Sequence, residues 1–524
     1  MSAPRGMHFL AGSVEGGDGA PFSALDPIGG AELQPVYREA SKDQVDRACV
    51  AAAAAADPFA ATPPATRAAL LRDIADGLQG LGDALVERVQ AETALPAARV
   101  EGERARTIMQ LNQFADLVED GSWVDARIDH ADPDRQPMPK PDLRRMHLPL
   151  GPVAVFGASN FPLAYSVAGG DTAPALAAGC PVIVKGHPAH PGTSEMVGGV
   201  IQAAVAKNGL PAGTFSLLHG RLHETGEALV SHEAVKAVGF TGSHGGGRAL
   251  CDIAAARREP IPVFAEMGSA NPVVVLPNAL RQRGAAVAAQ LAASALLAQG
   301  QFCTSPGMVV WLDGEGSEAF SATLREQLTG AAPGPAVHPS IRQGYERAMA
   351  ELTTLPVELS AAADRAVNSS DVCPALLQAT PQAFLQNARL RTEIYGPAVL
   401  AVVCEDAAQL QQVLAALDGH LTATVHGDGA DFVEHAAAVA ALRSRAGRLI
   451  ANGVPTGVEV SSAMVHGGPY PAASDARFSA VGVTSILRWV RPACWQDWPQ
   501  DQLPVELQDD NPRGISRLVN GEPG

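Results

Sequence analysis

The chain has 524 residues, with 38 Lys and Arg against 55 Asp and Glu, and a formal net charge of -17. This length exceeds what one hydrophobic core organises, so we expect two or three domains. The acidic balance argues against general binding to nucleic acid or to anionic membranes. The N-terminus lacks a secretory signal, and no apolar run reaches the roughly 18 residues of a membrane span. We therefore predict a cytoplasmic protein with no membrane partner.

The seven cysteines favour a reducing compartment. Their number is odd, none of them forms a C-x-x-C pair, and none stands near histidine at metal-site spacing. We therefore predict neither a disulfide framework nor a bound metal.

The first part of the chain is predicted to be mostly helical. Residues 1–40 are punctuated by glycine and proline, which favours a strand-rich lead-in or a surface arm. Helical periodicity follows, and we expect these helices to be scaffold. The periodic segments are 41–56, 67–79, 81–92 and 97–117. Five prolines then interrupt 118–150. This pattern favours either an exposed hairpin used between subunits or a linker.

From residue 151 onward, strand-like runs alternate with helical segments. The runs are 153–156, 182–184, 215–218, 235–240 and 261–264. This order predicts a parallel sheet with helices on both faces, as in nucleotide-binding α/β domains.

A second α/β pattern follows in the remaining half of the chain. Its predicted strands are 308–311, 398–403, 421–425 and 448–452. The Gly-, Ser- and Pro-rich stretch 453–480 is predicted to line a mouth or an interface. The polar stretch 491–524 is predicted to be a surface tail.

Four strand ends of the first sheet carry polar residues beside glycine. The stretches are 157–162, 185–188, 241–247 and 265–269. Because ligands in parallel sheets bind beyond the C-terminal strand ends, we expect these four stretches to form one crevice.

Cys303 is the candidate nucleophile. It follows an alanine-rich apolar run, 285–298, which Gly300 ends. A cysteine in a small, polar setting just past a helix can act as a thiolate nucleophile. The local sequence fits equally a small buried hydrophobic cysteine, so both readings stay open at this level.

Taken together, the motifs resemble the aldehyde dehydrogenase superfamily across roughly residues 38–490. The motifs that carry the resemblance are Ser159-Asn160-Phe161-Pro162, Val184-Lys185, Phe240-Thr241-Gly242-Ser243, Glu266-Met267-Gly268, Gly300-Gln301-Phe302-Cys303 and Glu393-Ile394-Tyr395-Gly396-Pro397. Within the superfamily, three stretches look like the 2-oxoglutarate semialdehyde (2,5-dioxopentanoate) dehydrogenase branch and the related bacterial NADP-linked fatty aldehyde dehydrogenase. These stretches are 156–165, 168–172 and 466–472.

The resemblance implies an α/β fold with two parallel-sheet α/β domains and a small β oligomerisation arm. It places a Rossmann-like cofactor domain in 1–124 and 148–267, and a catalytic domain in 268–452. The oligomerisation segments would be 125–147 and 481–500, with 501–524 as a C-terminal tail. A homodimer or homotetramer is expected.

The resemblance also assigns catalytic roles. Cys303 matches the thiolate that attacks the aldehyde carbon, and Asn160 matches the amide that stabilises the resulting oxyanion. Glu266 matches the base that activates water for hydrolysis of the thioester. Without the motif, Asn160 would be read as a turn residue and Glu266 as a solvated glutamate.

The expected coenzyme is NADP or NAD. Lys185 matches the lysine that binds the adenine-side ribose, and Gly242 and Ser243 match the turn that approaches the pyrophosphate. Glu393 matches the glutamate at the nicotinamide ribose, and Tyr395 replaces the usual phenylalanine. Gly226 is a further expected cofactor residue.

Pro188 stands where NAD-preferring relatives often carry a glutamate. No carboxylate there would repel a 2'-phosphate, and Lys185 and His187 would attract it, so NADP is slightly favoured. Proline also lacks the hydroxyl that usually contacts this phosphate.

His466 and three later residues complete the expected site. His466 matches a histidine near the nucleophile of the fatty aldehyde relative, where an imidazolium would favour the thiolate; equally, it could cap a turn. An α-keto acid needs a cationic or multi-donor anchor, for which Arg477, Ser479 and also Arg488 are candidates.

The function that the resemblance implies is NAD(P)-dependent oxidation of 2,5-dioxopentanoate to 2-oxoglutarate through a cysteine thiohemiacetal and thioester. The alternative is oxidation of medium- or long-chain aliphatic aldehydes. An alternative of another class is a catalytically silent nucleotide-binding or structural homologue, which the presence of Cys303, Glu266 and Asn160 disfavours.

Overall fold

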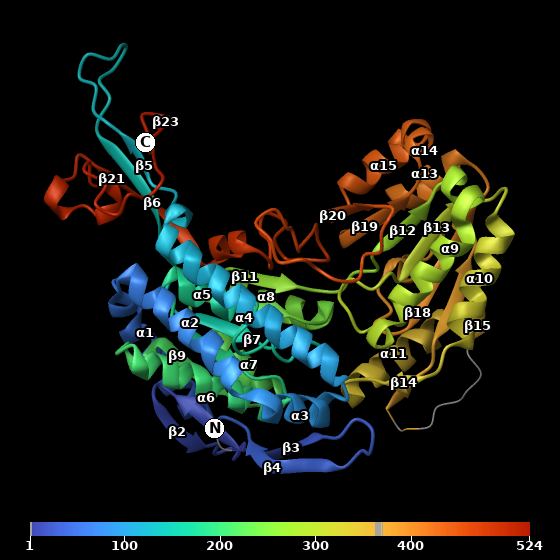
Figure 1. The fold of residues 1–524 in the computed structure, drawn as a ribbon, viewed down its shortest axis with the longest axis horizontal. Coiled ribbons are helices and arrows are strands. Elements are labelled where there is room, and N and C mark those ends of the chain that lie inside the picture. Colours follow the sequence, from blue (N-terminus) through green and yellow to red (C-terminus); the bar gives the residue numbers. More distant parts are fainter. Residues whose placement is uncertain (1–2, 362–367, 369) are drawn as a thin grey trace.

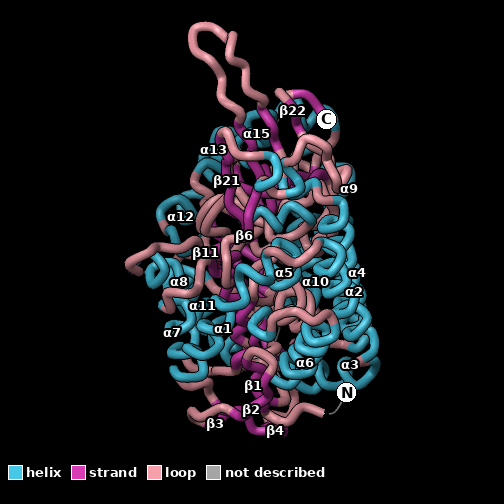
Figure 2. The backbone as a smooth tube through the Cα atoms, turned by 90° about the vertical axis from the view of Figure 1, so that its left-hand side faces the viewer, coloured by secondary structure: helices cyan, strands magenta, loops and turns pink. Residues whose placement is uncertain are grey.

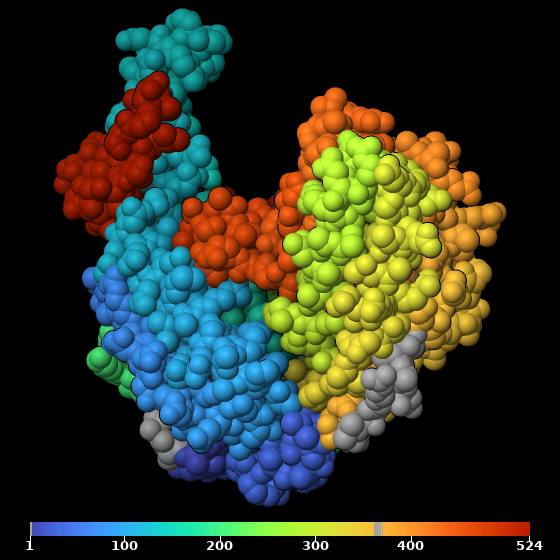
Figure 3. All heavy atoms as spheres, turned by 45° about the vertical axis from the view of Figure 1, so that its right-hand side comes forward, coloured from blue at the N-terminus to red at the C-terminus, as the bar shows by residue number. Residues whose placement is uncertain are grey.

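Two lobes and a projecting arm make up the protein in the computed structural model, which describes residues 3–361, 368 and 370–524 (Figure 1). The N-terminal lobe and the C-terminal lobe stand side by side, and an orange-red segment late in the chain joins them (Figure 3). Each lobe is built around one seven-stranded sheet. The fold therefore confirms the prediction of two α/β units with a small additional β arm.

The sheet of the N-terminal lobe has the order β11-β10-β7-β8-β9-β1-β2. Five of its strands are short, apolar and parallel, and they are buried because helices cover both faces. The strands are β1 Met7–Leu10, β2 Ser13–Gly16, β7 Val153–Phe156, β8 Val182–Lys185, β9 Phe215–Leu218, β10 Ala237–Thr241 and β11 Val263–Glu266. A separate hairpin pairs β3 Pro21–Leu25 with β4 Glu32–Arg38, so the lead-in is strand-rich as predicted.

Helices of the N-terminal lobe lie on both sides of its sheet (Figure 2). One apolar core joins the sheet to α2, α4, α5 and α6, and another joins it to α1, α7 and α8. The helices are α1 Lys42–Ala60, α2 Pro64–Gly80, α3 Gly82–Thr93, α4 Ala97–Asp120, α5 Thr172–Ala178, α6 Pro191–Lys207, α7 His223–Ser231 and α8 His244–Ala256. Short 3-10 turns are η1 Ser122–Val124 and η2 Ala212–Thr214.

The predicted crevice has a clear place in this sheet. In register, Phe156 lies beside Lys185 on one side and beside Phe240 on the other, and Thr241 lies beside Glu266. The chain leaves β7 toward β8 on one side and later returns to β10 on the other. All four polar strand ends therefore meet at one edge, at the point where the strand order reverses.

The sheet of the C-terminal lobe has the order β15-β17-β18-β13-β12-β19-β20, with only the edge strand β15 antiparallel among these pairs. The strands are β12 Pro272–Val275, β13 Met308–Leu312, β15 Val357–Ala361, β17 Ala375–Ala379, β18 Ala398–Cys404, β19 His420–His426 and β20 Ala446–Ala451. A short pair joins β14 Gly334–Pro335 to β16 Asp371–Val372.

Two apolar cores flank this second sheet. One contains residues of α9 and α10, and the other contains residues of α11, α12, α13 and α15. The helices are α9 Pro277–Leu296, α10 Ser317–Gly330, α11 Pro339–Leu352, α12 Pro381–Gln386, α13 Ala407–Ala415, α14 Gly429–Glu434 and α15 Ala436–Arg443, with 3-10 turns η3 Leu297–Gly300 and η4 Ala388–Arg391.

The arm is a five-stranded sheet in the order β21-β6-β5-β22-β23. Its centre is the antiparallel pair β5 and β6, so the hairpin alternative for 118–150 is confirmed. The strands are β5 Arg127–Asp129, β6 Leu143–Pro149, β21 Val490–Gln496, β22 Leu518–Val519 and β23 Glu522–Pro523, with 3-10 turns η5 Val483–Trp489, η6 Gln500–Gln502 and η7 Val505–Leu507.

The prediction of a surface tail at the C-terminus is wrong. Strand β21 pairs with β6 along seven positions, and β22 pairs in parallel with β5. Leu507 and Ile515 are buried, and the Arg144 guanidinium donates to the Leu507 carbonyl at 2.6 Å. The tail-like composition misleads because an edge strand needs little apolar alternation when its partner strand supplies the hydrogen bonds.

No helix among the described residues combines the length and apolar composition that a bilayer crossing requires. Within the same ranges, no group of three or more His, Cys, Asp or Glu side chains is arranged to hold a metal ion.

Candidate active site

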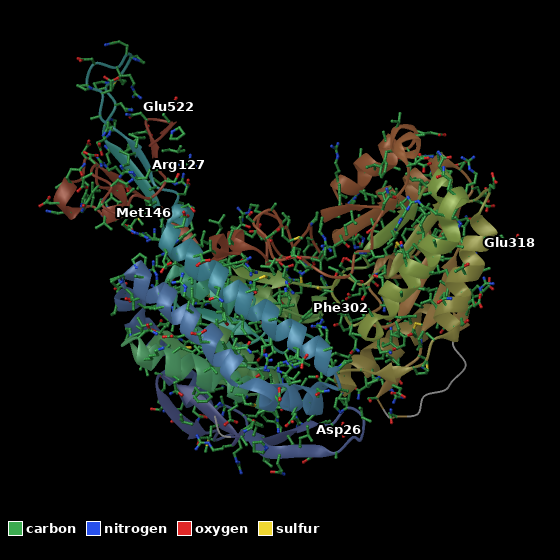
Figure 4. All side chains as sticks on the ribbon, in the orientation of Figure 1. Asp26, Arg127, Met146, Phe302, Glu318 and Glu522 are labelled. Atoms are coloured by element: carbon green, nitrogen blue, oxygen red, sulfur yellow. The ribbon has the colours of Figure 1, made fainter. Side chains whose placement is uncertain are left out.

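Cys303 lies just after the turn that ends helix α9. Ala298 and Gln299 have left-handed φ angles of 48° and 56°, and Gly300 has a φ of 66°. A Cβ atom on Gly300 would stand 2.2 Å from the Gly396 carbonyl oxygen, so only glycine fits there. The turn brings Phe302 and Cys303 to the region between the two lobes, where Phe302 is labelled in Figure 4.

Side chains from elsewhere hold the backbone around the cysteine. The amide Nδ2 of Asn160 and the hydroxyl of Tyr395 each donate to the Gln301 carbonyl oxygen at 2.9 Å. The amide Nδ2 of Asn271 donates to the Cys303 carbonyl at 2.9 Å. The Asn160 amide has a second N–H, so it can bind Gln301 and still donate to an oxyanion.

The Cys303 thiol contacts His466, with Sγ 3.6 Å from Nε2. Burial, assisted by the cations of Arg448, Arg106 and Arg488, lowers the pKa of His466 to about 3. Burial raises the pKa of Cys303 to about 12, assisted by the carboxylates of Glu393 and Glu266. The contact agrees with the resemblance. In the unliganded site these shifts favour a neutral thiol beside a neutral imidazole over the imidazolium that the resemblance suggested.

Glu266 ends strand β11 and is 6% exposed. Its Oε2 is buried and has no hydrogen-bond partner among the described residues. Burial raises the Glu266 pKa to about 8, while the Arg488 cation opposes that rise. A buried carboxyl of this kind, acting electrostatically on Cys303, is suited to exchange a proton near neutral pH.

A pocket of about 310 Å³ opens onto Cys303 from the side of helix α4. Aromatic rings form part of its wall, with Phe302 packed edge-to-face against Phe161 and Phe161 packed against Tyr165. The pocket is lined by Ala98, Arg99, Gly102, Glu103, Arg106, Phe161, Tyr165, Phe302, Cys303, Thr304, Gly457 and Val458.

Lys185 and His187 lie together at the end of strand β8. Burial lowers the pKa of Lys185 to about 8, while the Glu39 carboxylate opposes that shift. Burial keeps the pKa of His187 well below its ordinary value, and the neighbouring His190 and Lys185 add to this effect. Burial thus disfavours a positive charge on His187 in the unliganded protein, and Lys185 is the better candidate for a cation at this strand end.

The expected pyrophosphate turn forms the N-terminus of helix α8. Ser243 is the N-cap, and its hydroxyl accepts from the Gly246 N–H at 3.2 Å. Gly242 is exposed, and a Cβ on Gly245 would meet open space. Gly226 lies in α7, where a Cβ would stand 2.9 Å from the Phe156 ring, so this glycine permits close packing at the same sheet edge.

Glu393 lies on the other side of the crevice. A Cβ on Gly268 would stand 2.5 Å from the Glu393 carboxylate, so the two stretches meet closely. Burial raises the Glu393 pKa to about 8, while a backbone hydrogen bond from Ser269 opposes the shift. The residues at this edge fit a dinucleotide. They include a lysine whose ammonium donates to no described residue, an exposed helix N-terminus and a buried carboxyl group.

The structure does not bring Arg477 into the pocket. Its side chain is 80% exposed and pairs with Asp475 at the surface. Ser479 is buried, but its hydroxyl accepts from the His466 N–H at 3.0 Å and donates to the Val481 carbonyl at 2.6 Å. Its observed contacts therefore orient the His466 segment. Arg488 is buried in an ion pair with Asp171, and this charge is already matched.

The sequence reading missed the charged pocket wall. The sequence pattern predicts that helix α4 is scaffold, yet this helix contributes Arg99, Glu103 and Arg106 to the pocket beside Cys303. Their spacing of four and three residues places all three on one helix face, which was the available signal.

These features define an enzyme that uses a dinucleotide and a cysteine between two α/β lobes. The chain belongs to the aldehyde dehydrogenase family, whose model matches residues 14–470. It is an NAD(P)-dependent enzyme of that family.

Two curated relatives align over nearly the whole chain. "Alpha-ketoglutaric semialdehyde dehydrogenase 2" of Azospirillum brasilense is 49% identical over 519 residues, covering 99% of each chain. "Alpha-ketoglutaric semialdehyde dehydrogenase" of Acinetobacter baylyi is 41% identical over 526 residues, again covering 99% of each. Among solved structures, the aldehyde dehydrogenase KauB of Pseudomonas aeruginosa superposes with a TM-score of 0.80 at 20% identity, covering 94% of this chain and 97% of that one. Solved structures of this fold include a complex with NAD and a complex with NADP.

Proposed function

We propose that the protein oxidises 2,5-dioxopentanoate, the semialdehyde of 2-oxoglutarate, to 2-oxoglutarate. The observation that carries this proposal is the pocket that leads to Cys303, with aromatic walls and guanidinium groups from helix α4. The two relatives of 41% and 49% identity carry the name of this semialdehyde dehydrogenase. The apolar rings suit the two methylene groups of the substrate, and the cationic groups suit its α-keto acid end.

In the first step, the Cys303 sulfur bonds to the aldehyde carbon, and the carbonyl π electrons move to oxygen. Because the thiol starts protonated, its proton passes to Nε2 of His466, 3.6 Å away. The neutral imidazole presents a lone pair for this transfer, and its lowered pKa makes it a weak base that readily gives the proton up again. The second N–H of Asn160 then donates to the negative oxygen, while the first keeps its bond to Gln301.

The coenzyme, when bound, accepts the hydride that converts the thiohemiacetal into a thioester. Lys185, Ser243 and Glu393 would hold it, with Gly226 and Gly242 allowing close approach at the sheet edge. Tyr395 keeps the Gln301 carbonyl in place beside the reacting sulfur.

The thioester is then hydrolysed. Glu266 in its carboxylate form takes a proton from water, whose oxygen bonds to the thioester carbon as the carbon–sulfur bond breaks. The sulfur leaves with the bond electrons and is reprotonated. The products are the carboxylic acid and free Cys303.

NADP is inferred to be preferred over NAD. Pro188 places no carboxylate at the end of the Lys185 segment, and the Lys185 ammonium forms no hydrogen bond or ion pair with any described residue. Both features favour a 2'-phosphate over a bare 2'-hydroxyl.

The protein is further inferred to be a homodimer or homotetramer. The arm projects well away from the N-terminal lobe (Figure 1), and Met138 near its tip is 67% exposed. Deleting 131–141 should lower the mass measured by light scattering to that of one chain. An unchanged mass would assign subunit contacts to another surface.

The deciding experiment is steady-state kinetics with 2,5-dioxopentanoate and with a long-chain aliphatic aldehyde, each with NAD and with NADP. The proposal expects the highest kcat/KM for the dioxo acid with NADP. Preference for the long aliphatic aldehyde would overturn the substrate, and preference for NAD would overturn the coenzyme.

A further inference from the structure

The pocket above Cys303 contains two arginines that differ in their partners. Both come from helix α4, and both have an Nε that is buried without a hydrogen-bond partner among the described residues. An arginine whose charge is already paired with a carboxylate of the protein has little attraction left for a substrate anion. The pairing of each arginine therefore indicates which one could bind such an anion.

The charge of Arg99 is matched. Its Nη1 pairs with Glu103 Oε2 at 2.9 Å, and the Glu103 side chain is only 1% exposed. The same carboxylate accepts from the N–H groups of Leu163 and Ala164 through Oε1, both at 2.8 Å. Arg99 also stacks over the Phe161 ring at 4.4 Å, so its role is to close the pocket wall.

Arg106 has no such counter-ion. It takes part in none of the ion pairs formed by the described residues, and its guanidinium donates to the Tyr165 hydroxyl at 3.2 Å. Its carbon Cζ also lies 5.3 Å from the centre of the Tyr165 ring. A planar guanidinium held in this way keeps several N–H donors for a bidentate acceptor.

Arg106 and Cys303 line the same pocket. Its cation lowers the pKa of Cys303 and the pKa of His466. Tyr165, which orients it, lies 6.2 Å from His466 between ring centres. The unmatched charge therefore lies in the same pocket as the thiol, within reach of a small substrate attached to that thiol.

We propose that Arg106, oriented by Tyr165, binds the distal carboxylate and keto oxygen of the substrate and selects short aldehydes that end in an anion. This inference rests on the proposed function. It replaces the sequence-based candidates Arg477, Ser479 and Arg488, whose side chains are engaged elsewhere.

The test compares 2,5-dioxopentanoate with pentanal, an uncharged aldehyde of the same carbon number. Arg106→Gln should lower kcat/KM for the dioxo acid about 100-fold, which is the effect of losing hydrogen bonds to a charged group. It should lower kcat/KM for pentanal much less, by no more than the loss of a cation near Cys303 costs, and Arg106→Lys should restore part of the loss for the dioxo acid because it restores the charge. The matched control is Arg104→Gln on the same helix, since Arg104 donates to the Gly82 carbonyl and does not line the pocket.

A second measurement covers variants that fold poorly. Calorimetric binding of 2-oxoglutarate to the wild type should be lost in Arg106→Gln and kept in Arg104→Gln. Equal losses for the dioxo acid and pentanal, or an unchanged preference in Arg106→Gln, would overturn the anchor. If the wild type itself does not prefer the dioxo acid over pentanal, the proposed function fails instead.

Discussion

The sulfur of Cys303 and Nε2 of His466 lie 3.6 Å apart, although 163 positions separate them in the chain. Burial keeps the thiol protonated and the imidazole neutral, since the pKa values are about 12 and about 3. These shifts favour an uncharged pair, and the contact offers a path for the thiol proton when Cys303 attacks an aldehyde.

Replacing His466 with Gln should slow the first coenzyme reduction after mixing by about 100-fold, because general base catalysis contributes that much or more. The rate should be measured by stopped-flow absorbance, with the melting temperature as a check on folding. Ser479→Ala keeps the ring but loses the bond to the His466 N–H, so it should cost less. An unchanged rate in His466→Gln would remove His466 from the proton path.

The protonation state of Cys303 can be read from its alkylation by iodoacetamide in the unliganded enzyme. The thiolate is the reactive form, so a pKa near 12 predicts a rate that rises about 10-fold per pH unit from 7 to 9. Mass spectrometry of the Cys303 peptide would follow the rate, and the exposed Cys494 provides an internal reference. A plateau below pH 8 would mean that the thiolate is already formed.

Glu266 should control the acidic limb of the pH–rate profile. Its pKa is raised to about 8, so the carboxylate is the minor form at pH 7 and the major form above pH 8. The deacylation rate should therefore increase up to about pH 8 and level off above it. Glu266→Gln should give one equivalent of reduced coenzyme per site and then stall, with the acyl-enzyme visible by mass spectrometry. Continued turnover at the wild-type rate would exclude Glu266 as the base.

The ion pair between Arg488 and Asp171 is buried, with side chains 1% and 8% exposed. Arg488→Met leaves Asp171 without its partner and should reduce the free energy of unfolding by about 3–5 kcal/mol. Urea unfolding followed by fluorescence would measure this loss. Arg477→Leu breaks the exposed pair with Asp475 and should change stability little. Equal stability of the two variants would show that the buried pair contributes nothing.

Much of the site could be predicted because the chemistry lies at strand ends and turns with marked residue types. Asn160, Glu266 and Cys303 stand in short motifs, and the alternation of strands and helices indicated where those strand ends would meet. The approach of His466 to Cys303 was also expected from its motif.

The rest depends on contacts that local sequence does not encode. Arg106 lies in a helix whose sequence pattern is that of ordinary scaffold. Its proposed role as a substrate anchor depends on its having no ion-pair partner among the described residues. The lowered pKa of His466 follows from its burial and from the cations of Arg448, Arg106 and Arg488, which are far from it in the sequence or on other elements. Strand β22 has two residues and is a strand because it pairs with β5 and with β23, which its own sequence does not indicate.

The backbone carbonyl oxygen of Gln301 accepts hydrogen bonds from both lobes of the enzyme. Asn160 follows the sheet of the N-terminal lobe, and Tyr395 precedes strand β18 of the C-terminal lobe, yet both hold one carbonyl oxygen two residues before the nucleophile. The orientation of the backbone just before Cys303 is thus fixed only while the two lobes keep their relative position. A small slippage between the lobes would misalign the nucleophile before either lobe melts, so heat should abolish activity at a lower temperature than it abolishes helical structure.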